Sequence, residues 1–275
     1  VAGGEAKREE IVVCTKGGYF SFDGRYPKNR KEATEWVEKH FFATGLLRPK
    51  EVAQGCHAMA PAYLRHEVEQ SRKNLGVETI DVYYLHNPET QLGHVDRDEF
   101  KSRMKAAFET LEELAVAGQI RAYGLATWSG FRAAPTADDY LSLEELVGIA
   151  RGLAGHGHRM RFLQAPFNLA MLEAARFANQ RVGVRLVPLF EAARQLDVTC
   201  VASATILQGK LAKGLPTDIA EHCPGFSSDA QRAIHFNASV DLRAVRLVGM
   251  ATPKHVTENL SIGKRPPAPA ETAKK

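Results

Sequence analysis

The sequence predicts an α/β fold of the TIM-type (β/α)8 barrel class. Short, β-branched apolar runs alternate with amphipathic helical stretches along the chain. Strands separated in this way are joined by right-handed crossovers into a parallel sheet. Polar residues stand at the C-terminal ends of several runs, where barrel enzymes build their sites. No Gly-x-Gly-x-x-Gly segment follows a run, which disfavours the alternative, an open doubly wound sheet.

Six runs have the length and composition of buried strands. They are Ile11–Lys16, Asp81–His86, Arg121–Thr127, Phe162–Pro166, Val198–Ala204 and Val245–Met250. Four of them carry a polar residue at or near the C-terminal end, namely Lys16, His86, Thr127 and Gln164.

Helical periodicity fills most of the intervals. The expected helices are Pro61–Leu75, Asp98–Ala117, Ser142–Leu153, Val187–Leu196 and Ser228–Phe236. Pro61 suits a first helical turn, and Gly118 suits a helix end. Ser142 with Glu145 has the spacing of a capping box.

Six strands are two fewer than a complete barrel needs, although eight strand–helix pairs take about 250 residues. A long segment, residues 17–60, uses part of the length, and the chain opens on Val1 in what resembles a helix end. We therefore expect a barrel lacking roughly the first two strand–helix units. Residues 1–265 would form this single partial barrel, and residues 266–275 a disordered or loosely packed tail.

Composition limits the function classes. The 275 residues are 44% hydrophobic and 25% charged, with a net charge of +4 that is too small to indicate nucleic-acid binding. No apolar run is long enough to span a membrane, and the first residues lack the apolar core of a signal peptide. The four cysteines are scattered, which predicts small buried side chains in a reducing compartment. We expect a cytoplasmic protein without nucleic-acid or membrane partners, and the oligomeric state stays open.

Lys16 and His86 are the candidate catalytic residues. Alternation along a strand places Val12, Cys14 and Lys16 on one face, so Lys16 would stand above apolar neighbours at the barrel mouth. A lysine at a strand end often only reaches solvent, and a lone histidine is often buried and bonded to backbone. Consecutive strands ending in Lys and His at one rim nevertheless form a plausible constellation.

A metal site is not expected. His156 and His158 have the spacing of a ligand pair, but they precede a strand in a Gly-rich loop, so we expect them to be solvated. Asp81 begins its strand and so belongs to the stability end of the barrel, away from the site.

Several stretches resemble the aldo-keto reductases, in the same order along the chain from about Arg8 to Leu260. They are CTKGGY, SRKNLGVETIDVYYLHNPE, LEELAVAGQIRAYGLATW, LQAPFNLAM, VASATILQGKL and LVGMATPKHVTENL. The resemblance implies a (β/α)8 barrel that binds NADP(H) across its C-terminal face and transfers a hydride to a small-molecule carbonyl substrate. Lys16 matches the family's catalytic lysine and His86 its substrate-orienting histidine.

The resemblance also implies an Asp-x-x-x-x-Tyr segment that supplies the proton, upstream of IVVCTK. This chain has only VAGGEAKREE there, so we expect little activity from residues 1–275 alone. Tyr19 or Tyr26 could substitute, but a loop tyrosine more often packs on its neighbours.

The cofactor positions match the family in part. Gln164 matches the residue that bonds the nicotinamide amide, and Thr127 keeps one hydroxyl of a Ser-Asn pair. Ser203 stands where the family has an aromatic residue that stacks on the nicotinamide. The last stretch supplies Gly249, Met250, Thr252, Lys254, His255, Glu258 and Asn259, with His255 in place of an arginine at the 2′-phosphate. Thr252 and Pro253 predict a capped helix whose N-terminus favours phosphate.

Two functions stay open at this point. The first is NADPH-dependent reduction of aldehydes or ketones to alcohols. The alternative is a barrel that binds a nucleotide or a partner without turnover. The substrate would depend on residues 17–60 and 212–227.

Overall fold

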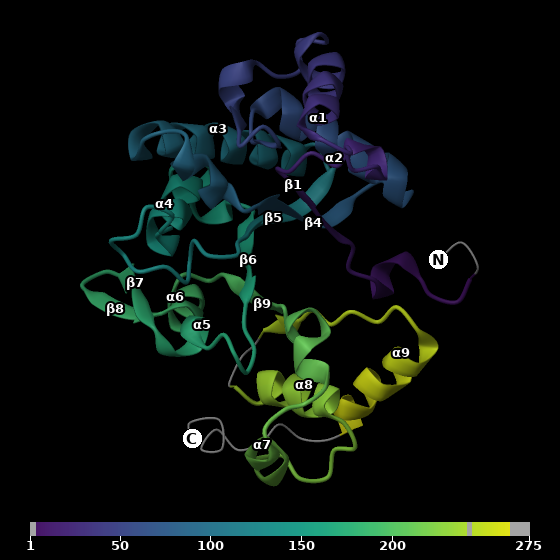
Figure 1. The fold of residues 1–275 in the computed structure, drawn as a ribbon. Helices are drawn as coiled ribbons and strands as arrows, with labels where there is room; N and C mark the ends of the chain where they lie inside the picture. Colours follow the sequence, from purple (N-terminus) through teal and green to yellow (C-terminus); the bar gives the residue numbers. More distant parts are fainter. Residues whose placement is uncertain (1–3, 241–243, 265–275) are drawn as a thin grey trace.

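The computed structural model describes residues 4–240 and 244–264 and contains one six-stranded parallel sheet (Figure 1). The strand order is β1-β4-β5-β6-β9-β10. The strands are β1 (Cys14–Gly17), β4 (Ile80–His86), β5 (Ile120–Ala126), β6 (Met160–Pro166), β9 (Thr199–Ser203) and β10 (Val245–Arg246). Each of the six runs predicted from the sequence overlaps one of these strands, so the α/β class with parallel strands is confirmed.

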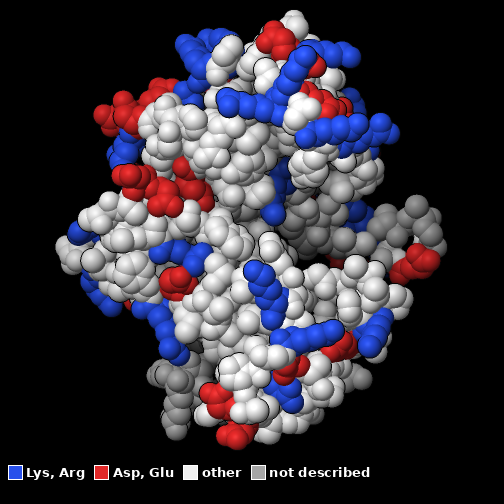
Figure 2. Space-filling model, in the orientation of Figure 1, with Lys and Arg blue, Asp and Glu red and all other residues white. Residues whose placement is uncertain are grey.

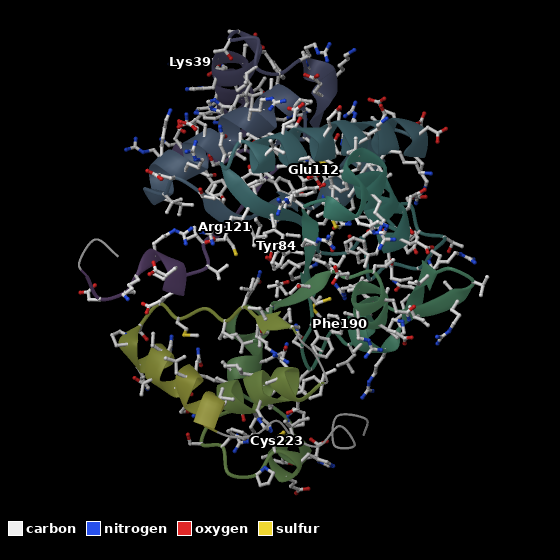
Figure 3. All side chains as sticks on the ribbon, turned by 180° about the vertical axis from the view of Figure 1, so that it is seen from behind. Lys39, Tyr84, Glu112, Arg121, Phe190 and Cys223 are labelled. Atoms are coloured by element: carbon white, nitrogen blue, oxygen red, sulfur yellow. The ribbon has the colours of Figure 1, made fainter. Side chains whose placement is uncertain are left out.

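The two faces of the sheet have different surroundings. Cys14 pairs with Val82 and Lys16 with Tyr84, so these side chains share the inner face. Val82, Tyr84 and Ala126 are buried together there, and Tyr84 lies at the centre of the molecule (Figure 3). The opposite face packs against helices through the large core that includes Tyr83, Leu85, Tyr123, Leu125 and Leu163.

Helices flank the strands much as the periodicity predicted. The longer ones are α2 (Pro61–Leu75), α3 (Arg97–Val116), α4 (Leu143–Ala154), α6 (Leu189–Gln195) and α8 (Asp229–Ser239). Ser142 Oγ accepts the N–H of Glu145, and Ser228 Oγ accepts that of Gln231, each at 3.3 Å, so both N-caps form. The helix α6 begins later than predicted, because Val187 belongs to a strand.

Residues 18–60 are more structured than a long connection. They include α1 (Arg30–Val37), a π-helical turn (Glu38–Phe42) and the short strands β2 (Val52–Ala53) and β3 (His57–Ala58). A second apolar cluster holds this segment against α2, with Phe20, Phe41 and Tyr63 packed ring against ring. The pattern was missed because these elements are short and interrupted by polar residues.

Short elements complete the chain. They are the hairpin β7 (Ala178–Val182) and β8 (Arg185–Pro188), and the helices α5 (Glu173–Arg176), α7 (Thr217–His222) and α9 (Pro253–Leu260). Helices α8 and α9 lie side by side at the end of the molecule opposite α1 (Figure 1).

The sheet is not closed into a barrel within the described residues. The strands β1 and β10 are its two edges, and β10 contributes only the pairs Val245–Val201 and Arg246–Ala202. The predicted strand Val245–Met250 was therefore too long. The tail predicted at residues 266–275 lies outside the described residues.

Exposure corrects the prediction for the cysteines. All four are free thiols, but only Cys200 is buried; Cys56 and Cys223 are half-buried and Cys14 is exposed. Acidic and basic side chains are interspersed over the face seen in Figure 2, in keeping with the small net charge of +4. Within residues 4–240 and 244–264, no helix combines the length and apolar character that a membrane crossing needs.

Candidate active site

The strand register brings several predicted site residues to one edge of the sheet. His86 pairs with Ala126, and Ala126 with Gln164, so the three stand in one row across β4, β5 and β6. Val201 of β9 pairs with Gln164, and Ser203 lies two residues beyond it, paired with Pro166. Because the strands are parallel, this row is the C-terminal edge of the sheet.

The charge of Lys16 acts on the titration of His86. Burial, and secondarily the charge of Lys16, lowers the pKa of the half-buried His86 from 6.5 to about 4. Lys16 is more exposed, but partial burial among its neighbours also lowers its pKa. The site therefore combines a neutral imidazole with a nearby primary amine.

Thr127 and Gln164 are joined through the backbone, where the N–H of Thr127 donates to the carbonyl of Gln164 at 2.9 Å. Both residues are buried, at 5% and 8% exposure. The hydroxyl of Thr127 is buried without a hydrogen-bond partner, and in the described part of the chain the side-chain amide of Gln164 makes no hydrogen bond. Two polar side chains at the rim thus have bonding capacity to spare.

The residues after β10 form a second group around α9. Thr252 Oγ1 accepts the N–H of His255 at 3.3 Å, so the predicted capped helix is confirmed. Gly249, Met250, Lys254 and His255 are exposed.

The other two members of this group are half-buried. Glu258 accepts a short hydrogen bond from Ser228 Oγ, which ties α9 to the N-terminus of α8, and Asn259 lies beside it in sequence. No hydrogen bond or ion pair among residues 4–240 and 244–264 joins this group to Lys16 or His86.

Comparison with known proteins decides the family. The family model for aldo/keto reductases matches residues 1–223. The chain belongs to the aldo/keto reductase family. No curated protein sequence matches it.

Solved aldo-keto reductases share its fold. The holo form of aldo-keto reductase AKR11C1 from Bacillus halodurans superposes with a TM-score of 0.62 at 16% identity, over 98% of this chain and 73% of that one. Its apo form superposes with a TM-score of 0.54 at 18% identity, over 78% of this chain and 66% of that one. The glycerol dehydrogenase AKR11B4 from Gluconobacter oxydans superposes with a TM-score of 0.56 at 20% identity, over 79% of this chain and 63% of that one. The chain thus spans roughly two thirds to three quarters of these structures, and the likeness supports the barrel class.

The rim has groups that suit the nicotinamide cofactor of this family. The hydroxyl of Thr127, which has no hydrogen-bond partner among the described residues, and the amide of Gln164 are the kind of groups that bond a carboxamide. Ser203, which is half-buried, offers a hydroxyl but no ring for stacking. At α9, Lys254 and His255 place nitrogen-bearing side chains at a helix N-terminus, which suits phosphate.

Sequence reasoning missed three buried polar residues behind this rim. His57 is fully buried and bonds the backbone of His86, and Gln91 bonds His57. Glu89 accepts the N–H groups of residues 128, 129 and 130 through one oxygen, which holds the loop after β5. A histidine inside the apolar stretch Cys56–Ala60 was the available signal for His57.

Tyr19, considered above as a substitute proton donor, lies edge-on to both His57 and His86, with ring centroids 4.9 and 5.2 Å apart. Its hydroxyl is 2.8 Å from Thr90 Oγ1. Tyr26 is 84% exposed and makes no such contact in the described residues.

His156, His158 and Asp81 were predicted to lie outside the active site. The described residues contain no group of three or more His, Cys, Asp or Glu side chains able to hold a metal ion. His156 is exposed, but the prediction that His158 is solvated was wrong, since it is 2% exposed and burial lowers its pKa. Asp81 accepts the N–H of Val13 at 2.7 Å and pairs with Arg8 and Arg121 at the start of β4, which confirms its structural place.

Proposed function

We propose that the protein is an NADPH-dependent oxidoreductase that reduces an aldehyde or ketone to an alcohol by hydride transfer. The observation that carries the proposal is the placement of Lys16, His86 and Gln164 at one rim of a parallel sheet in an aldo/keto reductase. The substrate in this proposal is a small carbonyl compound, and the elements within residues 17–60 shape its site.

NADPH, when bound, supplies the hydride. His86 is neutral near pH 7 because its pKa is about 4, and a neutral imidazole keeps one N–H to donate to a carbonyl oxygen. Lys16 provides positive charge close to the oxygen that becomes negative as the hydride arrives. Together they stabilise the developing oxyanion more than the neutral carbonyl, which is the requirement for catalysis, and a proton from solvent water then converts the oxyanion into the alcohol.

The cofactor residues fall into two groups in this proposal. Thr127, Gln164 and Ser203 hold the nicotinamide amide at the rim. Lys254 and His255 receive the 2′-phosphate at the N-terminus of α9, and Glu258 and Asn259 hold the adenine. The segment that leads into α9 contains the last three cofactor residues, Gly249, Met250 and Thr252.

Family membership favours an enzyme over the alternative of a nucleotide- or partner-binding barrel without turnover. The four free thiols fit a reducing compartment, so we propose the cytoplasm as its location.

The test measures NADPH binding by fluorescence and carbonyl-dependent NADPH oxidation with reactive aldehydes. Lys16→Met and His86→Ala should each lower the turnover rate at least about 10²-fold and change the NADPH Kd much less, because both groups act on the carbonyl. The exposed Lys105 and His156 offer matched controls, Lys105→Met and His156→Ala. Turnover close to that of the unsubstituted protein in either rim variant contradicts the roles, and absence of NADPH binding contradicts the function.

A further inference from the structure

His57 connects the segment between β1 and α2 to the end of β4. Its side chain is 0% exposed, and its Nε2 lies 2.8 Å from the carbonyl oxygen of His86. A carbonyl oxygen only accepts, so Nε2 carries the proton and donates. His57 therefore holds the backbone of the residue whose side chain we place in the active site.

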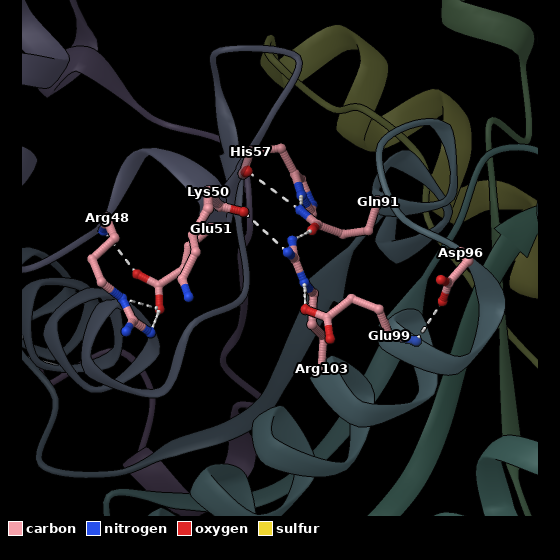
Figure 4. Close-up of polar contacts among 8 residues, drawn as sticks. All are labelled: Arg48, Lys50, Glu51, His57, Gln91, Asp96, Glu99 and Arg103. Carbon is pink, nitrogen blue, oxygen red and sulfur yellow. Dashed lines mark hydrogen bonds and ion pairs between the residues drawn. The ribbon is translucent and has the colours of Figure 1, made fainter.

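Behind His57, hydrogen bonds connect it to Gln91 and connect Gln91 to Arg103 (Figure 4), and the chemistry of the side chains identifies the donor in each. Arg103 Nη1 donates to Gln91 Oε1 at 2.7 Å, and a guanidinium cannot accept. The other end of the Gln91 amide is consequently its N–H₂ group, which donates to His57 Nδ1 at 2.8 Å. With Nδ1 accepting, the single proton of the neutral ring is on Nε2, where His86 needs it. Burial lowers the pKa of His57 to about 4, which keeps the ring neutral.

Arg103 is itself held in place. Its Nε donates to Glu99 at 2.8 Å and its Nη2 to the carbonyl of Lys50 at 3.0 Å (Figure 4). The first of these bonds lies within one turn of α3, and the second reaches the segment that leads into β2. The row Arg103–Gln91–His57 thus extends from a surface helix to the rim of the sheet.

The backbone of His57 is anchored beside the strand of Lys16. Tyr19 and His57 form a β-bridge, and the N–H of Ala58 donates to the carbonyl of Gly18 at 2.9 Å. A Cβ on Gly18 would come within 2.9 Å of both His57 Nε2 and the His86 oxygen, so only glycine leaves room for this hydrogen bond. The contact therefore links the ends of β1 and β4.

The His86 carbonyl stands at a point where the chain leaves the sheet abruptly. Asn87 has φ of 45°, which is the left-handed region, and its N–H donates to Ala126 at 2.7 Å. The peptide after His86 is thus fixed through Asn87 on the β5 side and through His57 on the β1 side. A peptide held on both sides limits rotation of the residue that precedes it.

We propose that His57 is a positioning residue for His86, with Gln91 and Arg103 selecting the tautomer in which it donates. The inference rests on the proposed function of His86. It extends the site to a row of buried polar groups and explains why a histidine lies inside an apolar segment.

The experiment compares His57→Met with His57→Gln in the full chain. Glutamine places an amide N–H₂ near the position of Nε2 and an oxygen toward Gln91, so it preserves both hydrogen bonds, whereas methionine fills the space and preserves neither. We expect kcat to fall on the order of 10- to 100-fold in His57→Met and to recover to within about threefold in His57→Gln, with a similar Kd for NADPH in both.

A second readout does not depend on turnover. The ring ¹⁵N shifts of His86 report its pKa. This pKa should rise from about 4 towards 6.5 in His57→Met, because a ring that is no longer held in place is less buried, and it should stay near 4 in His57→Gln. An unchanged His86 pKa in a folded His57→Met protein overturns the proposal. If the protein shows no reductase activity at all, the proposed function fails, and the His86 titration still decides whether His57 positions it.

If His57→Met does not fold, the variant Gln91→Met tests the proposal instead. It keeps the histidine and removes the donor to Nδ1, together with the acceptor of Arg103 Nη1 and the weaker hydrogen bond to the His57 carbonyl. We expect the ¹⁵N shifts of His57 to change from those of a single Nε2–H tautomer to those of a mixture, with a lowered kcat. Retention of the single tautomer together with an unchanged kcat overturns the proposal.

Discussion

At the scale of single residues, the electrostatics of the site depend on which side chains carry a positive charge near neutral pH. His57 and His86 both have a pKa of about 4, and in both cases burial is the main cause. Lys16 contributes to the shift at His86 because an ammonium disfavours a second cation nearby. The two imidazoles are therefore hydrogen-bonding groups near neutral pH, and Lys16 supplies the charge.

Lys16→Met tests this electrostatic coupling. Without the ammonium, protonation of His86 costs less, so its pKa should rise from about 4 but stay below 6.5, since burial persists. Titration of the histidine rings by NMR measures the change. Lys105→Met removes an exposed lysine on α3 and should leave the His86 pKa unaltered. An identical His86 titration in Lys16→Met would show that the two residues do not interact.

At the scale of elements, the helix α9 is placed by its neighbour. It buries no residue, and the hydrogen bond from Ser228 to Glu258 and the bond from Gln231 to Ser261 join it to α8. Its N-terminus stays exposed, with Lys254 and His255 in the first turn. A helix N-terminus of this kind favours anions, and we propose that it receives the 2′-phosphate.

Replacing Lys254 and His255 by alanine together should weaken NADPH binding about 10-fold or more and change NADH binding by no more than about twofold, because only NADPH carries the 2′-phosphate. Fluorescence titration with each dinucleotide gives the two Kd values. Lys105→Ala is the control for loss of a surface charge. An equal loss of affinity for both dinucleotides would contradict this placement.

At the scale of the whole molecule, the sheet formed by the described residues ends at two edge strands, β1 and β10. Apolar side chains flank them, with Val12 72% exposed beside β1, and with Val245 55% and Leu247 43% exposed at β10. Exposed apolar edges offer unpaired backbone groups to another chain. The inner face behind these edges carries Tyr84 and the row of site residues.

We expect the chain to self-associate through these edges. Val12→Lys and Val245→Lys should each shift the association to higher protein concentration, because a lysine at an edge opposes strand pairing. Sedimentation and light scattering across a concentration series measure the shift. Val116→Lys changes a valine that is even more exposed, at the end of α3, and should have no effect. A chain that stays monomeric at all concentrations would refute this expectation.

The sequence by itself determined the local structure and the edge of the sheet at which Lys16 and His86 lie. Six strand runs and five helices were predicted because apolar periodicity, caps and strand-end polar residues are properties of neighbours in sequence. Lys16 and His86 were predicted at one edge because parallel strands end on the same side, and the register bears this out.

Only the tertiary structure decided which buried residues form hydrogen bonds behind that edge of the sheet. The bonds from Arg103 to Gln91, from Gln91 to His57 and from His57 to His86 join residues 12, 34 and 29 positions apart. The burial of His158 and the exposure of Cys14 likewise depend on which elements pack over them. The two edge strands of the described sheet follow from strand pairing across the whole molecule. These features are contacts between distant segments, and local periodicity carries no information about such contacts.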